Sequence, residues 1–327
     1  MKWISSLLLG ASNPLYGGQA VIGGVMMKGK KHYAISVNTP SGLQSKTEEF
    51  HSISEKIPFL KWPFLRGVVN LVEMMILGYK SMDYAADKSL EAEEQSDTVP
   101  IISEKLLSKE SDSSNSNSSK VEKQISPWMM VGTFLLSLVL AIGLFKFLPL
   151  LAARGLDNLF NLLSPVFNLV DGVIKLGILF LYLILIAQIK DIKDVFRYHG
   201  AEHKTINCYE AKKPLTVKNI SSFTTVHKRC GTTFIFVVIF LSILVYMFIP
   251  KDIPFFINLA LRLALLPLIA SIGYEIQRFG ATHSNFLINA LVTPGLLLQK
   301  ITTNEPSPKH IRAAKAALEE VIKAENN

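Results

Sequence analysis

The residues best suited to chemistry form an HGAEH pattern, in which His199 and His203 flank Glu202. If the segment is helical, successive residues are about 100° apart, so the two imidazoles project about 40° apart and can bind one divalent metal. HxxEH is the signature of the inverted zinc peptidases, in which the glutamate acts as general base. The spacing therefore predicts a zinc site with two histidine ligands and Glu202 as the catalytic residue.

The remaining ligands are expected from a second polar segment, which contains His227 and Cys230. A catalytic zinc site has three protein ligands and one open position, so either residue would complete it beside His199 and His203. If all four residues closed around zinc, the site would be structural instead. A third alternative contains no metal, and the histidines then form a hydrogen-bonded surface network with Glu202.

Further charged residues surround the expected site. Lys204 and Arg229 adjoin the proposed ligands, where they would bind an anionic substrate or, in the absence of a metal, lipid headgroups. Glu210 falls close to His199 in helical azimuth, and Glu275 follows the last predicted membrane span. We expect each of these charged residues to contact substrate or to support the site, and Glu275 is also a candidate ligand.

The composition indicates a membrane protein with a soluble part. Of the 327 residues, 49% are hydrophobic and the mean hydropathy is positive, which is too apolar for a soluble two-domain protein. Only two cysteines, Cys208 and Cys230, are present, which excludes a disulfide framework. Four apolar runs each approach the ~20 residues that cross the hydrocarbon layer. They are residues 128–150, 172–189, 231–249 and 255–274.

The basic residues predict how these spans are oriented. The chain has a net charge of +8, but it contains no nucleic-acid-reading module, so we expect no nucleic-acid partner. Lysine and arginine are concentrated in residues 190–228 and in both terminal regions, whereas residues 151–171 and 250–254 hold one basic residue each. Basic residues favour the cytoplasmic side of a membrane. We therefore expect a multi-pass protein of the cell membrane, with both termini and the HxxEH segment in the cytoplasm.

Changes in composition divide the chain into four expected parts. Residues 1–90 predict a cytosolic meander of three strands, at 19–27, 32–38 and 43–50, followed by an interfacial helix at 63–79. Residues 91–127 are rich in serine and acidic residues, which predicts a disordered linker. The four-helix membrane domain covers 128–306 and includes the HxxEH loop at 190–230. An amphipathic helix at 307–327 is expected to end the chain as a surface or docking element.

The expected fold class is therefore a mainly α membrane protein, with four transmembrane helices, a small N-terminal β meander, and amphipathic or re-entrant helices. The re-entrant or interfacial segment is residues 284–299, because Pro294 and Gly295 interrupt an apolar run there. Arg262 lies near the middle of the last predicted span, where a charge is costly and is expected to be paired. Its candidate partners are Asp171, Asp157 and Glu73, and it would either order the helices or contact substrate.

Five strings of the sequence, in order, resemble the YqhQ-like membrane proteins, a family of unknown function whose members are often labelled predicted metal-dependent enzymes. The resemblance covers most of the chain outside residues 91–126 and implies a metal-dependent activity. In one departure, the first motif of the family usually has a glutamate where this chain has Gly23. The strings are GGQAVIGGVMMKG (17–29), YHGAEHKTINCYE (198–210), HKRCGTTF (227–234), RLALLPLIASIGYE (262–275) and PGLLLQKITTNEP (294–306).

These observations favour a membrane-embedded, metal-dependent hydrolase with a cytosol-facing site. Basic residues beside the expected metal favour an anionic, lipid-linked substrate over a peptide, and membrane lipids are the expected partners. The alternative is a non-enzymatic multi-pass membrane protein, which would act as an assembly, scaffold or transport factor and would use the histidines and cysteine as a structural cluster.

Overall fold

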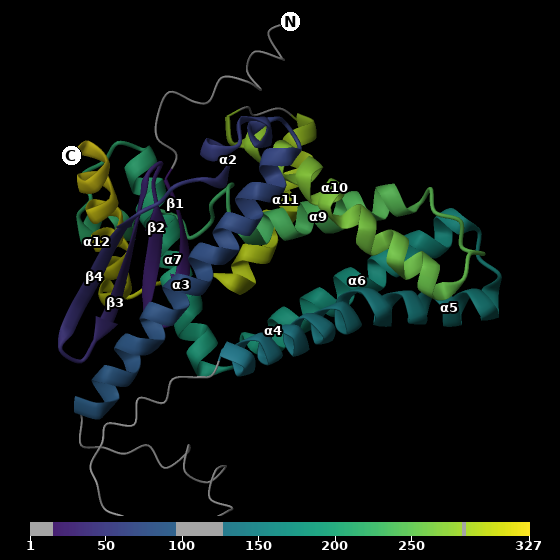
Figure 1. The fold of residues 1–327 in the computed structure, drawn as a ribbon, viewed down its shortest axis with the longest axis horizontal. Helices are drawn as coiled ribbons and strands as arrows, with labels where there is room; N and C mark the ends of the chain where they lie inside the picture. Colours follow the sequence, from purple (N-terminus) through teal and green to yellow (C-terminus); the bar gives the residue numbers. More distant parts are fainter. Residues whose placement is uncertain (1–15, 96–126, 283–285) are drawn as a thin grey trace, which may run out of the picture.

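The computed structural model describes residues 16–95, 127–282 and 286–327 (Figure 1). The described chain is mainly helical and carries one four-stranded antiparallel sheet near its N-terminus. The linker that the sequence predicts at 91–127 lies outside the described residues from 96 to 126. Its first residues differ from the prediction, because residues 91–95 continue a long helix that ends at Gln95.

The sheet has its strands in sequence order, β1-β2-β3-β4. The sequence predicts three strands, but residues 19–27 do not form a single strand, because a turn at Ile22 and Gly23 divides them. Gly23 has a φ of +71°, a left-handed conformation that glycine adopts without steric cost. The strands are β1 (Gly17–Val21), β2 (Gly24–Lys28), β3 (His32–Thr39) and β4 (Gly42–Glu49).

Helices cover both faces of this sheet. Because successive residues of a strand point to opposite faces, Val25 and Met27 pack in one core and Met26 packs in another. The first core includes Leu318 of α12 and Ala201 of α7, and the second is closed by α3. The covering helices are α3 (Leu65–Gln95), α7 (Lys190–Glu210) and α12 (Pro308–Asn326).

Two of these helices differ from the sequence predictions. The C-terminal helix α12 is a core element rather than a surface element, because its alanines are small enough to bring it against β2 and β3. The interfacial helix predicted at 63–79 forms only the first half of α3, which has 31 residues. Two short helical segments precede it, α2 (Ile53–Lys56) and η1 (Pro58–Lys61).

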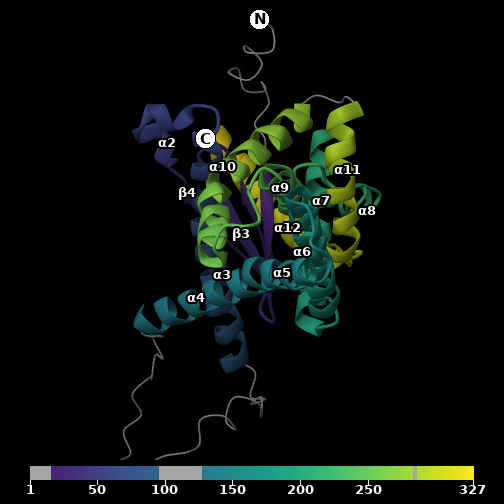
Figure 2. The ribbon, with the colours of Figure 1, turned by 90° about the vertical axis from the view of Figure 1, so that its right-hand side faces the viewer.

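Within the part of the chain that the structure describes, three helical stretches are long and apolar enough to cross a membrane, which indicates a multi-pass membrane protein. The first stretch is continuous from residue 132 to 160, because α5 prolongs α4 through a π-helical turn, η3. In Figure 1 these helices extend away from the sheet, and Figure 2 views them from their far end. They are α4 (Pro127–Ile142), η3 (Gly143–Phe147) and α5 (Leu148–Phe160), then α6 (Ser164–Ile186) and α10 (Phe255–Thr282).

The remaining helices complete the arrangement around the polar segments. The run that the sequence predicts as a span at 231–249 forms α9 (Gly231–Tyr246), which has 16 residues and is shorter than the three stretches above. The helix α11 (Phe286–Thr302) continues through Pro294, so the expected interruption of residues 284–299 is wrong. Gly295 allows α11 to pack closely on α9, since a Cβ at this position would press on the backbone of Thr233. The short α8 (Val217–Ser221) follows α7.

Candidate metal centre

The HGAEH pattern lies within α7, on a helix that is packed closely against its surroundings, and residues 190–210 are therefore helix rather than loop. Gly200 permits this packing, because a Cβ at this position would overlap the backbone carbonyl oxygen of Asn304. The N–H of Asn304 donates to the carbonyl oxygen of Phe196 at 2.9 Å. The segment after α11 is thereby fixed against α7, and the two histidines of the pattern meet the N-terminus of α9.

Three side chains, His199, His203 and Cys230, form a compact group. One ligand atom from each lies within 4.8 Å of the others, and Sγ of Cys230 is 3.2 Å from Nε2 of His199. Cys230 is the N-cap of α9, and its Sγ accepts a hydrogen bond from the backbone N–H of Thr232 at 3.4 Å. The sulfur therefore lies at the N-terminal end of a helix, where backbone N–H groups without a partner inside the helix can donate to it.

Backbone carbonyl groups orient both imidazoles. Nδ1 of His199 lies 2.8 Å from the carbonyl oxygen of Thr302, and Nδ1 of His203 lies 2.6 Å from that of Thr225. A carbonyl oxygen only accepts hydrogen bonds, so each Nδ1 must carry the proton. In the neutral rings, Nε2 then keeps its lone pair for a metal, which is the arrangement that supports histidine ligands in metalloproteins.

Glu202 lies beside this group. Its Oε2 is 3.4 Å from Nε2 of His203, and the side chain is 7% exposed. Gly18 of β1 makes room for it, because a Cβ on Gly18 would come within 2.8 Å of Cγ of Glu202. The carboxylate therefore lies next to the three candidate ligands without being one of them, as a base acting on a bound water would.

His227 occupies a different position from the three candidate ligands. Its ring centroid is 5.7 Å from that of His203, its Nδ1 accepts the backbone N–H of Arg229 at 3.4 Å, and its Nε2 lies 3.3 Å from Oε2 of Glu210. Both ring nitrogens thus have protein partners. Of the two residues that the sequence offered as a third ligand, the structure brings only Cys230 into the group.

The carboxylate of Glu210 is held by two neighbours. Burial raises its pKa, but hydrogen bonds from His227 and Arg229 and the charge of Arg229 lower it further, so the net pKa lies below the usual range. Arg229 also donates to the carbonyl oxygen of Tyr16 at 3.1 Å. Glu210 and Arg229 therefore link α7 to the start of the sheet.

The other charged residues that the sequence singled out lie elsewhere. Glu275 accepts a hydrogen bond from Nε of Arg66 at 2.6 Å, which fixes α3 against α10 and leaves Glu275 outside the candidate metal group. Lys204 bonds to Glu305 and to the carbonyl oxygen of Ser221. Arg262 is buried among the membrane helices and pairs with Asp171, one of its three candidate partners.

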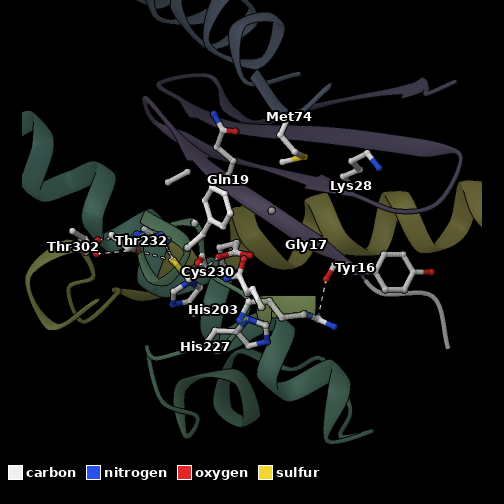
Figure 3. A pocket seen from close by; sticks show the side chains of 18 of the residues that line it. Tyr16, Gly17, Gln19, Lys28, Met74, His203, His227, Cys230, Thr232 and Thr302 are labelled. Atoms are coloured by element: carbon white, nitrogen blue, oxygen red, sulfur yellow. Dashed lines mark hydrogen bonds and ion pairs between the residues drawn. The ribbon is translucent and has the colours of Figure 1, made fainter. Parts of the chain in front are cut away.

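A pocket of about 660 Å³ opens in front of the candidate ligands. Cys230 and His203 lie on one wall, and Gln19, Met74 and Lys28 line the opposite wall (Figure 3). The pocket is bounded by β1, α3, α7, α10 and the N-terminus of α9, so it joins segments that are far apart in the sequence. Gly23 is not among its lining residues, so a glutamate at that position would belong to the β1–β2 turn instead.

Sequence reasoning missed several residues that line the pocket. Asn70 and Met74 come from α3, and Tyr274 and Gln277 come from α10, where they read as parts of apolar or interfacial helices. Two signals were available: the polar stripe that contains Asn70 in the otherwise apolar helix at 63–79, and the pair of glycines at the start of β1, a pattern that indicates close approach of the backbone to another element. Gly18 does approach Glu202 in this way.

The fold and this group of side chains define a class: a multi-pass membrane protein with an N-terminal antiparallel sheet and a buried His/His/Cys group that could hold a metal. Comparison with known proteins gives the family. Residues 62–324 match the family described as "Protein of unknown function (DUF1385)", and the chain belongs to it. It is 31% identical over 326 residues to a Bacillus subtilis (strain 168) protein titled "Uncharacterized protein YqhQ", covering 95% of this chain and 93% of that protein. No solved structure matches the chain.

Proposed function

We propose that this protein is a membrane-embedded, metal-dependent hydrolase whose pocket accepts an anionic, lipid-linked substrate. One observation carries the proposal: His199, His203 and Cys230 converge at a pocket, with Glu202 beside them. Three protein ligands leave a position open for water, as catalytic zinc sites require. Imidazole and thiolate ligands favour zinc over magnesium or calcium, which prefer oxygen ligands.

The roles of the chain's own residues follow from their positions. A zinc ion held by the three ligands would activate water and polarise the substrate. Glu202 is placed to accept a proton from the attacking water and to donate it to the leaving oxygen. The carboxylate then ends the reaction in its starting, ionised form. The carbonyl oxygens of Thr302 and Thr225 keep His199 and His203 in the tautomer that can bind the metal.

The pocket lining supports an amphiphilic substrate. Apolar side chains such as Met74, Leu71 and Phe234 line it together with the cations Lys28 and Arg229. Lys28 lies over the ring of Phe50, 4.2 Å from its centre, and is not in ion-pair contact with a carboxylate of the described residues. We therefore assign Lys28 to the anionic group of the substrate, and the apolar walls to its hydrocarbon part.

The proposal includes an orientation. The concentration of lysine and arginine in residues 190–228 supports a pocket on the cytoplasmic side, with both termini on that side. The short apolar helix α9 would complete the membrane domain as a fourth span, with Cys230 at its cytoplasmic end. Labelling of single cysteines introduced on either side of the membrane tests this orientation directly.

The proposal is tested by metal analysis of the detergent-purified full chain, together with Glu202→Gln. We expect near-stoichiometric zinc in the wild type and in Glu202→Gln, because Glu202 is not a ligand. In cells, Glu202→Gln should cause an anionic lipid species to accumulate relative to the wild type in whole-lipid mass spectrometry. Absence of metal from the wild type would sink the enzyme proposal. Metal in both proteins with identical lipid profiles would favour a structural His/Cys cluster instead.

A further inference from the structure

A second polar cluster lies among the apolar helices, around the ring of Tyr246. Three cationic side chains from three different segments surround this ring: Lys146 of η3, Lys175 of α6 and Arg262 of α10. Their charged groups are 5.3, 5.4 and 4.9 Å from the ring centre, respectively. Cations are attracted to the face of an aromatic ring, but three of them around one ring repel each other.

The cluster has more positive than negative charge. Asp171 is the one carboxylate, among the described residues, that forms an ion pair with these cations: it contacts Nζ of Lys175 at 3.2 Å and also pairs with Arg262. Asp171, Lys175 and Arg262 are at most 3% exposed, so water does not screen their charges. A charge in the interior of a membrane is costly unless an opposite charge pairs with it. The cluster thus brings together three cationic side chains and one carboxylate, and a negatively charged ligand would keep all three cations in their charged form.

The cluster also contains hydrogen-bonding groups without partners. Nδ2 of Asn258, a donor, and Oδ1 of Asp171, an acceptor, are both buried and make no hydrogen bond. Each lysine ammonium has three N–H donors, yet among the described residues Lys146 bonds only to the hydroxyl of Tyr246, at 3.4 Å, and Lys175 only to Asp171. A matching ligand accepts several hydrogen bonds and donates one, to Oδ1 of Asp171.

This cluster is separate from the candidate metal centre. Cys230 caps the N-terminus of α9, whereas Tyr246 is its last residue, and a helix of 16 residues is about 24 Å long. None of the described residues that line the pocket belongs to the cluster. A ligand of the cluster would therefore bind independently of the proposed substrate.

We propose that this cluster binds a phosphate group, either the phosphomonoester of a lipid headgroup or free inorganic phosphate. Such a group is negatively charged near pH 7, as the three cations require, and it has several acceptor oxygens. The monoanion of a lipid phosphomonoester and the dianion of inorganic phosphate each have one hydroxyl, which donates to Oδ1 of Asp171. Lys146, Lys175 and Nδ2 of Asn258 supply the donors to its oxygens.

The first test measures phosphorus in the detergent-purified full chain, separately in an organic extract and in the aqueous residue. We expect bound phosphorus in the wild type and in Lys300→Gln, which changes an exposed lysine of α11. We expect it to fall to the blank level in the double variant Lys146→Gln, Lys175→Gln. Phosphorus in the organic extract identifies a lipid as the source, and phosphorus in the aqueous residue identifies free phosphate. Equal amounts in wild type and double variant would show lipid held nonspecifically and overturn the proposal.

A second measurement uses only the wild type, so it holds even if the double variant does not fold. The delipidated chain is melted with inorganic phosphate, with short-chain phosphatidic acid, with the matching diacylglycerol, and with sulfate at equal ionic strength. A ligand of the native state raises Tm. We expect phosphate or phosphatidic acid to raise Tm, and diacylglycerol and sulfate not to, because sulfate has no hydroxyl at neutral pH to donate to Asp171. No rise with either phosphate probe, or an equal rise with sulfate, overturns the proposal.

Discussion

The two polar clusters of this protein are built in different ways. Backbone carbonyl groups orient His199 and His203, and a backbone N–H at the start of α9 donates to Cys230. These three side chains lie at the edge of a pocket. Around Arg262, in contrast, charged side chains hold one another among apolar helices. The first cluster could hold a metal, whereas in the second the cationic side chains outnumber the carboxylate that pairs with them. Substitutions should therefore affect metal content at the first cluster and stability at the second.

The largest effect is expected at the metal ligands. Cys230→Ser and His199→Ala should abolish metal binding at near-stoichiometric levels, because each removes one of three ligands. His227→Ala should retain the metal, with affinity reduced by no more than about 10–100-fold, since His227 acts only from outside the group. Metal content of each purified variant decides the matter. Loss of metal in His227→Ala to the same extent as in Cys230→Ser would show that His227 is the third ligand.

At the second cluster, Arg262→Met should destabilise the protein by about 3–5 kcal/mol, the usual effect of removing one member of a buried ion pair. The guanidinium group bonds to Asp171, Asn168 and Asn258, and all three would lose a donor. Denaturant unfolding in detergent measures the change. Arg312→Met, at an exposed position of α12, is the matched control. An effect no larger than that of the control would contradict this account.

A smaller loss of stability is expected at the packing that positions α7. Gly200→Ala places a Cβ against the carbonyl oxygen of Asn304, a backbone atom that cannot rotate away. Overpacking of this kind costs about 1–3 kcal/mol. Gly155→Ala, in α5, has open space around it and should be neutral or stabilising. The unfolding midpoints of the two variants compare these sites directly. Similar midpoints would show that α7 can shift away from Asn304 without loss of stability.

The smallest effect concerns pH, at the contact between α7 and α12. Nε2 of His310 lies 3.0 Å from Asp194, while its Nδ1 accepts the backbone N–H of Ser307. Burial lowers the pKa of His310 below 6.5. Burial raises the pKa of Asp194, but the hydrogen bond from His310 and nearby positive charges lower it more, so its net pKa is also below the usual value.

Both shifts have the same consequence for stability. As pH falls below about 6.5, the unfolded chain takes up a proton at residue 310 before the native chain does, so the native state loses stability. At lower pH the same holds for Asp194, because its native pKa lies below its unfolded value. His310→Gln should therefore flatten the decline of Tm between about pH 7 and pH 5, and His51→Gln, at an exposed histidine, should not. Parallel pH profiles for wild type and His310→Gln would rule out this contribution.

Prediction from sequence succeeded for the long periodic segments and failed at two shorter signals. Gly23 and Gly24 interrupt the strand-forming residues of the run from 19 to 27, and the chain turns there because Gly23 adopts a left-handed conformation. At Pro294 the opposite occurs: proline predicts a break, yet α11 is continuous and the adjacent Gly295 packs against Thr233 of α9.

Some residues of the candidate site could be predicted from the sequence, and others could not. The spacing of His199 and His203 places both imidazoles on one face of a helix whatever surrounds it, so the sequence alone identified this pair. The choice between His227 and Cys230 depended on contacts across α7 and α9 that no spacing encodes. Glu275, a candidate ligand by its position after a span, is held by Arg66 of α3, a helix far away in the sequence.

The sequence by itself determined the class of the protein, because apolar runs of spanning length and the i, i+4 histidine pair are properties of single segments. Only the tertiary structure decided which residues meet: Cys230 with the two histidines, Glu202 with Gly18, and Arg262 with Asp171. The physical reason is that a ligand set or an ion pair depends on distances of a few ångströms between segments. Those distances follow from how helices and strands pack, and the packing depends on the whole chain at once.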